Sequence, residues 1–133
     1  MRRAVACILS IVVLASTASA GDQPYLFDML KKPAYRAAWD ALLTGEKDVP
    51  PWLAKYAKTL NGPSGPGQMV RIRDSDYQLN DVCKTHDCGN NYFIVLFAPS
   101  GQRAWGLLRI NGDTQRFFGN PDEEKKRVMS ETD

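Results

Sequence analysis

The residues best suited to chemistry gather in one polar stretch in the second half of the chain. The single histidine of the sequence, His86, lies there between Cys83 and Cys88. Imidazole and thiol groups bind zinc, exchange disulfides and act as bases or nucleophiles near neutral pH. The spacing of these three residues therefore decides which of those chemistries the chain can support.

A metal or redox site is disfavoured by that spacing. Structural zinc sites use four ligands, and Cys83, His86 and Cys88 supply three. Redox pairs usually have two residues between the cysteines, whereas four lie between them here, and the haem-attachment pattern Cys-x-x-Cys-His is absent. We therefore predict no bound metal and no cofactor.

Hydrolytic catalysis has no better support. A serine or cysteine nucleophile needs a histidine base, and His86 lies beside a cysteine that we expect to be oxidised. The sequence has no Gly-x-Ser-x-Gly elbow, phosphate-binding glycine loop or His-Glu-x-x-His motif. Two pairs of acids could imitate the carboxylates of a glycosidase, Asp74 with Asp76 and Glu123 with Glu124. The first pair is explained more simply by a predicted turn and the second by a helix N-terminus. We predict that the protein is not an enzyme.

Residues 1–20 have the pattern of a secretory signal peptide. Two arginines precede an apolar run over residues 4–15, and the small residues Ala18 and Ala20 suit signal peptidase. The run is too short to cross a bilayer. We expect cleavage before Gly21, which leaves residues 21–133 as a single domain, in the periplasm if the source has two membranes.

Removal of this segment changes both the cysteine count and the charge. Cys7 is lost, and the two remaining cysteines, in an oxidising compartment, predict one disulfide between Cys83 and Cys88. The segment carries two of the 17 basic residues and none of the 15 acidic ones, so the side-chain charges of the mature chain balance. No broad attraction to nucleic acid or to a membrane surface is predicted.

The disulfide gives the polar stretch its shape. The bridge closes a short loop, which stabilises the fold by roughly 2 kcal/mol on chain-entropy arithmetic, and a hairpin staple is its simplest role. A loop closed at its neck also cannot collapse onto the sheet, so Lys84, Thr85, His86 and Asp87 should project into solvent. Such a loop binds a partner without losing much conformational entropy.

Helical spacing dominates the region before residue 61. Apolar residues recur three or four apart between residues 25 and 43, and Pro33 suits the first turn of a helix. We expect Trp52 to lie at the edge of the core. The expected elements are a short one ending near Lys31, a helix over residues 33–43, a rigid connection over residues 49–53, a helical turn over residues 54–60 and a Gly/Pro-rich linker over residues 61–67.

An alternating pattern follows the linker and predicts strands. The run over residues 92–98 is continuously apolar, which is typical of a central strand covered on both faces. The pair Asn111-Gly112 favours the positive φ angles of a type I′ hairpin turn. The expected strands are residues 69–73, residues 77–82 after the turn Asp74-Ser75-Asp76, and residues 92–98, 104–110 and 113–118.

A last short helix is expected near the C-terminus. Asn120 and Pro121 supply a cap and a first-turn proline, and acidic residues follow, so we predict a helix to about Met129. The fold class is therefore α+β. We expect a central, mainly antiparallel sheet of about five strands, flanked by short helices, with a disulfide-closed protruding loop.

The loop Cys83-Lys84-Thr85-His86-Asp87-Cys88 resembles the Ivy family, the inhibitors of vertebrate lysozyme that Gram-negative bacteria export. The mark of that family is Cys-Lys-Pro-His-Asp-Cys, and this chain departs from it at Thr85. The residues 49–53, Val-Pro-Pro-Trp-Leu, are similar to the Leu-Pro-Ala-Trp stretch of the family. The resemblance covers most of the mature chain, and the part beyond Gly119 is short for the family.

The resemblance implies a protein that inhibits C-type lysozyme and so protects peptidoglycan. In this interpretation the loop enters the active-site cleft, His86 meets the two catalytic carboxylates, and Lys84 adds positive charge near an acidic cleft. Asp87 either orients the imidazole or reaches basic residues at the cleft rim. The sequence leaves open which lysozyme is bound and whether the protein is a monomer or a homodimer.

A second interpretation keeps the scaffold and changes the target. The chain would then be a periplasmic binding domain that controls the lytic transglycosylases of its own cell or contacts peptidoglycan. Transglycosylase clefts also carry an acidic catalytic residue, so His86 can serve there too. Direct glycan binding needs exposed aromatic residues, whereas most aromatic residues of this sequence have the spacing of a core.

Overall fold

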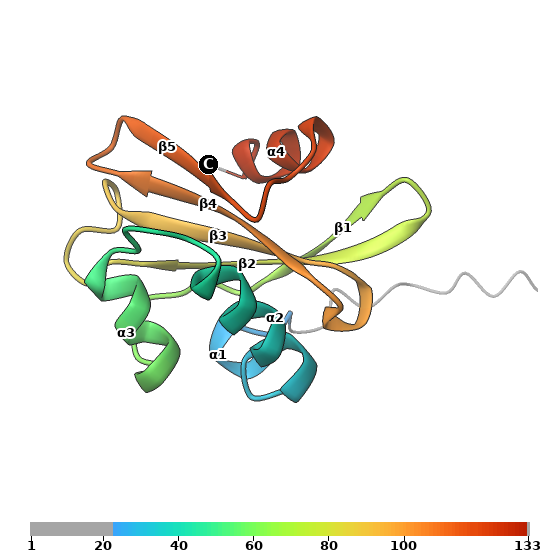
Figure 1. Ribbon diagram of the computed structural model, residues 1–133, viewed down its shortest axis with the longest axis horizontal. Coiled ribbons are helices and arrows are strands. Elements are labelled where there is room, and N and C mark those ends of the chain that lie inside the picture. The colour runs from blue at the N-terminus through green and yellow to red at the C-terminus, as the bar shows by residue number, and fades with distance from the viewer. Residues whose placement is uncertain (1–22, 133) are drawn as a thin grey trace, which may run out of the picture.

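The structure is a computed structural model that describes residues 23–132 (Figure 1). The expected signal peptide lies outside the described residues. In chain order the elements are α1 (Leu26–Met29), α2 (Pro33–Thr44), α3 (Pro51–Thr59), β1 (Gln68–Ile72), β2 (Ser75–Cys83), β3 (Tyr92–Phe97), the 3₁₀ turn η1 (Pro99–Gly101), β4 (Ala104–Ile110), β5 (Thr114–Phe118) and α4 (Glu123–Ser130).

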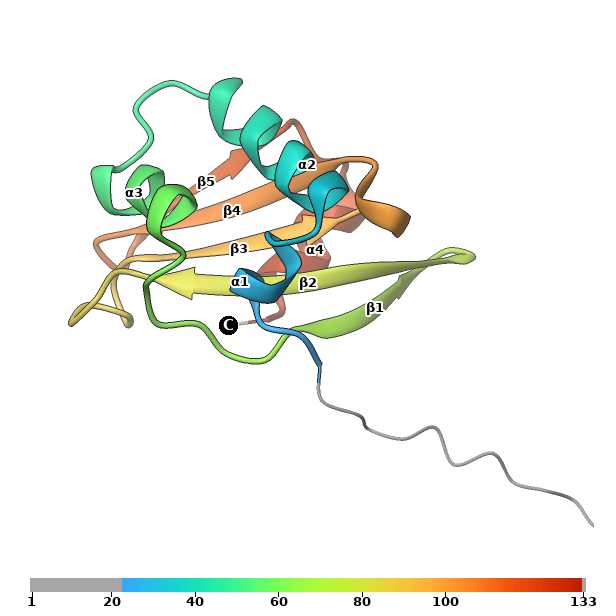
Figure 2. The same ribbon diagram turned by 90° about the horizontal axis from the view of Figure 1, so that it is seen from below.

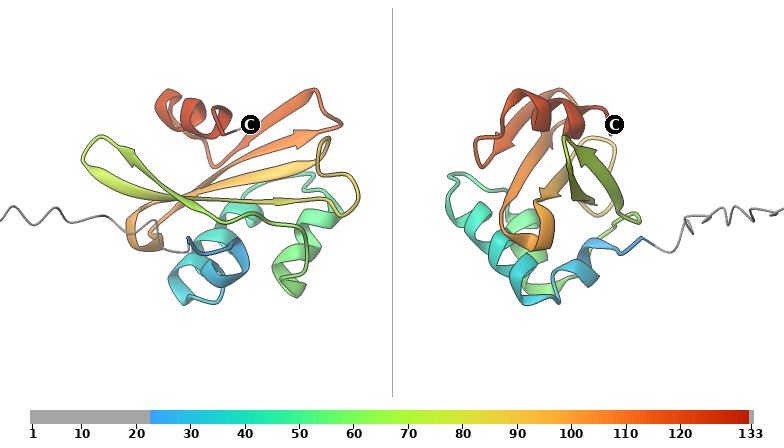
Figure 3. Two further views of the ribbon diagram at one scale, coloured as in Figure 1. Left: turned by 180° about the vertical axis from the view of Figure 1, so that it is seen from behind. Right: turned by 90° about the vertical axis from the view of Figure 1, so that its right-hand side faces the viewer.

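Five strands form one sheet in the order β1-β2-β3-β4-β5, and every neighbouring pair is antiparallel. Helices α1, α2 and α3 cover one face of this sheet, and α4 lies on the other (Figure 3). The predicted α+β class with a five-stranded antiparallel sheet is confirmed.

The central strand β3 explains why the sheet needs helices on both faces. Phe93, Val95 and Phe97 belong to the core beneath α1–α3, whereas Ile94 and Leu96 belong to the core on the side of α4. Alternate residues of a strand point to opposite faces, so a continuously apolar strand must be covered twice. The expectation drawn from residues 92–98 is thus confirmed.

Two element boundaries in the first half of the domain differ from expectation. Pro51 begins α3, because the fixed φ of proline suits the first helical turn, so the last three of the five residues of the expected rigid connection are helical. The turn between β1 and β2 is Arg73-Asp74, not Asp74-Ser75-Asp76. Asp76 lies in β2 opposite Arg71, and its carboxylate accepts a hydrogen bond from the Arg71 guanidinium at 3.0 Å.

The C-terminal helix begins later than expected. Asn120 has a positive φ of 55° and is not the cap. Asp122 is extended and its carboxylate accepts a hydrogen bond from the Lys125 N–H at 3.0 Å, which is the geometry of an N-cap. Glu123 and Glu124 form ion pairs with Lys126 and Arg73, at 2.9 and 3.4 Å. These carboxylates therefore have structural partners.

Candidate functional site

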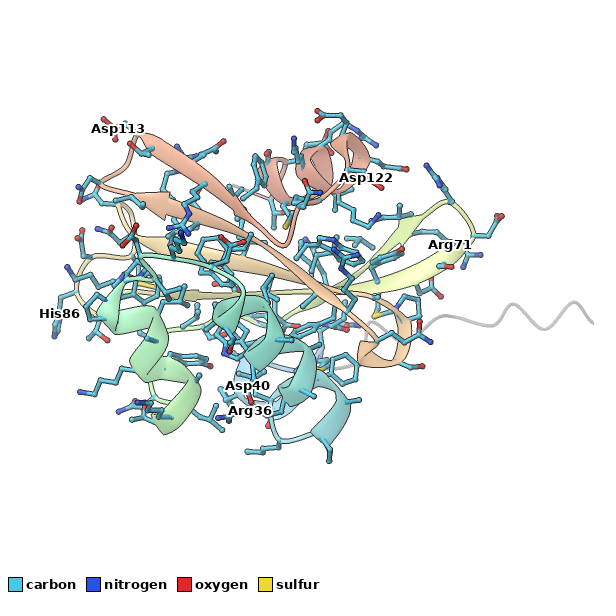
Figure 4. All side chains as sticks on the ribbon, in the orientation of Figure 1. Arg36, Asp40, Arg71, His86, Asp113 and Asp122 are labelled. Atoms are coloured by element: carbon cyan, nitrogen blue, oxygen red, sulfur yellow. A yellow bond between two sulfur atoms is a disulfide. The ribbon has the colours of Figure 1, made fainter. Side chains whose placement is uncertain are left out.

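The loop between β2 and β3 protrudes at one end of the molecule (Figure 2). His86 lies at the extreme of that end, on the side of Asp113 and opposite the end that carries Arg71 (Figure 4). Lys84, Thr85 and His86 are exposed, as predicted, whereas Asp87, for which the same was predicted, is only half-exposed.

The expected disulfide joins Cys83 and Cys88, whose Cα atoms lie 4.9 Å apart. Cys83 is the last residue of β2 and pairs with Tyr92, the first residue of β3. The bridge therefore closes the loop directly at the last residue pair of the β2–β3 ladder. It also removes both thiols from any metal site, and residues 23–132 contain no group of three His, Cys, Asp or Glu side chains placed to hold a metal ion.

A tight turn carries His86. The Asp87 N–H donates to the Lys84 carbonyl at 2.9 Å, and His86, the third residue of this turn, has φ = 66°. Thr85, the second residue of the turn, is not among the residues with positive φ. A hydrogen-bonded turn with positive φ at its third position and not at its second is of type II. Histidine is among the non-glycine residues that adopt this conformation more readily than most. The imidazole is thus displayed at the corner of a defined turn.

The Asp87 carboxylate faces the base of the loop. Its Oδ1 accepts from Asn90 Nδ2 at 2.9 Å, and its Oδ2 accepts from Asn91 Nδ2 at 2.7 Å. These two amides, with a smaller effect of Lys84, hold the pKa of the Asp87 carboxyl below its ordinary value. Both oxygens of Asp87 thus accept hydrogen bonds from side-chain amides at the base of the loop.

Asn90 and Asn91, which were not predicted to be functional residues, secure the loop to the β4–β5 turn. The Gly112 N–H donates to the Asn90 carbonyl at 2.9 Å, and the Asn111 N–H donates to Asn91 Oδ1 at 3.2 Å. Two adjacent asparagines after a glycine indicate a turn, because their side chains bond readily to nearby backbone. Their contacts 20 residues further along the chain carry no sequence signal.

A groove of about 850 Å³ lies beside the loop, on the face of the sheet that also carries α4. Leu79 and Ile94 contribute apolar surface, and Asp81 contributes a carboxyl whose pKa is raised by burial. Arg109 Nε donates to the Tyr92 hydroxyl at 3.0 Å and Arg109 Nη1 donates to the Gly112 carbonyl at 3.2 Å. The guanidinium thereby braces the same turn that supports the loop.

In the part of the chain that the structure describes, no helix is long and apolar enough to span a membrane. The aromatic residues largely fill the core, as expected. Trp39, Phe93 and Phe118 are fully buried, and Trp52 packs partly buried against the core beneath the helices.

Comparison with known proteins identifies relatives over most of the chain. A family model described as "Inhibitor of vertebrate lysozyme (Ivy)" matches residues 34–130. The chain is 32% identical to the inhibitor of vertebrate lysozyme of Pseudomonas aeruginosa, in an alignment that covers 94% of this chain and 91% of that protein.

Two further relatives are longer than this chain. The inhibitor of vertebrate lysozyme of Escherichia coli K12 is 29% identical over 81% of this chain and 64% of its own length. An uncharacterised protein of Yersinia pestis is 32% identical over 75% of this chain and 62% of its own length. The chain therefore spans less than two thirds of these two relatives.

Proposed function

The chain belongs to the Ivy family of inhibitors of vertebrate lysozyme, and on this premise we propose that it inhibits a C-type lysozyme. The disulfide-closed loop enters the active-site cleft of the enzyme, and His86 lies against its catalytic carboxylates. The observation that carries this proposal is the exposed His86 at the corner of a hydrogen-bonded turn, within a loop that the Cys83–Cys88 bridge closes.

The chemistry of the target fits an imidazole. The lysozyme cleft holds a carboxylic acid with a raised pKa beside an ionised carboxylate, and turnover needs a sugar and a water molecule between them. An imidazole placed there donates hydrogen bonds, and as imidazolium it donates charge-assisted ones, which are shorter and stronger. Its bulk also displaces the water and the sugar.

The surroundings of His86 suit an acidic cleft. Lys84 is exposed two residues away and adds positive charge, whereas the carboxylate of Asp87 is occupied by the amides of Asn90 and Asn91. The single acid between the two cysteines is thus bonded at the base of the loop. Repulsion between this acid and the acids of the target is reduced by that placement.

The proposed role is that of a binding protein without turnover of its own. The inhibitor acts in the periplasm and protects peptidoglycan from hydrolysis. The loop is a rigid insert and loses little conformational entropy when it binds.

The test is a titration of a C-type lysozyme with the oxidised protein, residues 21–133. We expect stoichiometric inhibition by the wild-type protein. The inhibition constant should rise at least tenfold in His86→Ala and stay unchanged in Lys58→Ala, a control at an exposed lysine of α3. Absence of inhibition by folded, oxidised wild-type protein would overturn the lysozyme assignment. Equal inhibition by wild type and His86→Ala would overturn the role of the imidazole.

A further inference from the structure

Asn91 differs from the rest of the loop in its burial. Its exposed fraction is 7%, whereas Lys84, Thr85 and His86 are exposed. Burial of an amide costs free energy unless its donors and acceptors are paired. The hydrogen-bond partners of Asn91 therefore indicate its structural role.

Asn91 binds both ends of the turn that carries His86. Its carbonyl accepts from the Lys84 N–H at 2.9 Å, and its own N–H donates to the Asp87 carbonyl at 3.0 Å. Its side-chain Nδ2 donates to Asp87 Oδ2 at 2.7 Å. His86 lies between Lys84 and Asp87 in the chain. One buried residue therefore holds the backbone at both ends of the turn that carries the imidazole.

The same side chain reaches the β4–β5 turn. Asn91 Oδ1 accepts from the Asn111 N–H at 3.2 Å, while the adjacent Gly112 N–H donates to the Asn90 carbonyl at 2.9 Å. Asn111 and Gly112 have φ values of 51° and 81°, a combination that asparagine and glycine adopt readily. The direction of these two N–H groups, and with it the placement of the loop, depends on that turn.

We propose that Asn91 is a positioning residue for inhibition, which ties the loop to the β4–β5 turn and thereby fixes the direction in which His86 meets the target. This inference rests on the proposed function. Asn91 is buried and acts through His86, and the turn at Asn111-Gly112 is its rigid support.

The first experiment is a double-mutant cycle between Asn91→Ala and His86→Ala, with lysozyme affinity as the measurement. Asn91→Ala alone should weaken binding at least fivefold. In the His86→Ala background the same substitution should change affinity less than twofold, because the imidazole that it misplaces is gone. An equal effect in both backgrounds, or no effect of Asn91→Ala in a folded protein, would overturn the proposal.

A nearly isosteric variant supplies a readout that simple loss of structure does not give. Asn91→Asp keeps the acceptor for Asn111 but places a second carboxylate against Asp87, with Lys84 as the charged group that acts on the pair. At this end the β4–β5 hairpin carries Arg109 and Asp113. His86, the neighbour of Asp87 in the chain, is present in both the variant and wild type, so the ratio of their affinities isolates the effect of the added carboxylate. Two carboxylates this close share a proton, so acid restores the bond.

At pH 8 Asn91→Asp should therefore bind lysozyme at least fivefold more weakly than wild type does. At pH 5 its affinity should be within twofold of the wild-type value. The matched control, Asn91→Ala, should show the same deficit at both pH values. A deficit of Asn91→Asp that does not change with pH would contradict the assigned hydrogen bond.

Failure of the two proposals can be told apart by a measurement that needs no lysozyme. NMR relaxation of the Thr85 and His86 amides reports the order of the turn in the free protein. These amides should become more mobile in Asn91→Ala, and unchanged mobility would overturn the positioning role. Lack of lysozyme inhibition by wild type, with increased mobility in the variant, would overturn the proposed function alone.

Discussion

The carboxylate of Asp87 lies 2.7 Å from the side-chain amide of Asn91, so the acidic residue next to His86 is bonded to the base of the loop. Asn90 occupies the second oxygen at 2.9 Å. A carboxylate that accepts two amide hydrogen bonds is a strong local anchor, because charged hydrogen bonds contribute more than neutral ones. The order of the loop therefore depends on the charge of Asp87 as well as on the disulfide.

This anchor predicts that the loop loses order in acid. The pKa of Asp87 is held below the ordinary value of 3.8, so the stabilisation is fully present above pH 3.8 and is lost as the pH falls through the lower pKa of the folded protein. NMR relaxation of the Thr85 and His86 amides, followed from pH 5 to pH 2, should show increased mobility. In Asp87→Asn the mobility should be raised at pH 5 already and should not change with pH. A loop equally rigid at both ends of that range in wild type would contradict the anchor.

Thr85→Pro should strengthen inhibition. Thr85 is the second residue of the type II turn closed by the hydrogen bond from Asp87 to Lys84, a position where proline is favoured because its fixed φ matches the turn. A proline compatible with the folded backbone stabilises the fold by about 0.4–1 kcal/mol, and it also removes conformations of the free turn that cannot bind, so the inhibition constant should fall by up to roughly fivefold. The measurement is the inhibition constant against a C-type lysozyme.

Thr85→Ala is the matched control for this change. It removes the threonine side chain without restricting φ, and its inhibition constant should stay within twofold of wild type. Tighter binding by Thr85→Ala than by Thr85→Pro would show that the threonine side chain, and not the freedom of the turn, limits affinity.

Several features of the site followed from the sequence because their causes are local. Alternation of apolar residues predicted the strands, continuous apolarity placed β3 at the centre, and Cys83 with Cys88 predicted the bridge. The support of the loop was missed because it is formed by residues far apart in the chain. Nothing near Asn91 indicates that its side chain meets the backbone of Asn111.

The boundaries that were predicted wrongly have a related cause. Asn120 and Asp122 are both good caps, and the choice between them depends on which backbone conformation lets the chain turn from β5 into α4. Asn120 has a positive φ and forms part of the turn that leaves β5, so Asp122 is the residue that caps the helix. The sequence-based prediction named Asn120 alone, and the conformation of the turn between β5 and α4 selects Asp122 instead.

Removal of the disulfide by Cys83→Ser/Cys88→Ser should weaken inhibition without unfolding the domain. The bridge closes a short loop and contributes roughly 2 kcal/mol on chain-entropy arithmetic, whereas the hydrogen bonds of Asp87 and Asn91 remain. We expect the inhibition constant to rise between three- and thirtyfold while the far-UV circular dichroism spectrum is retained. Full potency of the bridgeless protein would mean that the hydrogen bonds alone order the loop.

Gly106→Ala should destabilise the domain and leave the loop competent. A Cβ at Gly106 would overlap Cζ of Phe93, and that ring cannot move aside because it packs edge-on against Trp39 and contacts Phe118, with centroid distances of 5.6 and 5.2 Å. Overpacking of this kind costs about 1–3 kcal/mol, which lowers Tm by roughly 5–15 °C in a domain of this size. Differential scanning calorimetry measures the shift.

The matched control is Gly89→Ala, because a Cβ at Gly89 meets no atom within 4 Å and Tm should not change. At 25 °C, where both variants are folded, Gly106→Ala should inhibit lysozyme as wild type does. The direction of His86 is set by Asn91 and the β4–β5 turn, and these contacts lie at the end of the sheet, outside the ring cluster around Phe93. Weaker inhibition by Gly106→Ala at 25 °C, together with its lower Tm, would show instead that the packing of the core controls the loop.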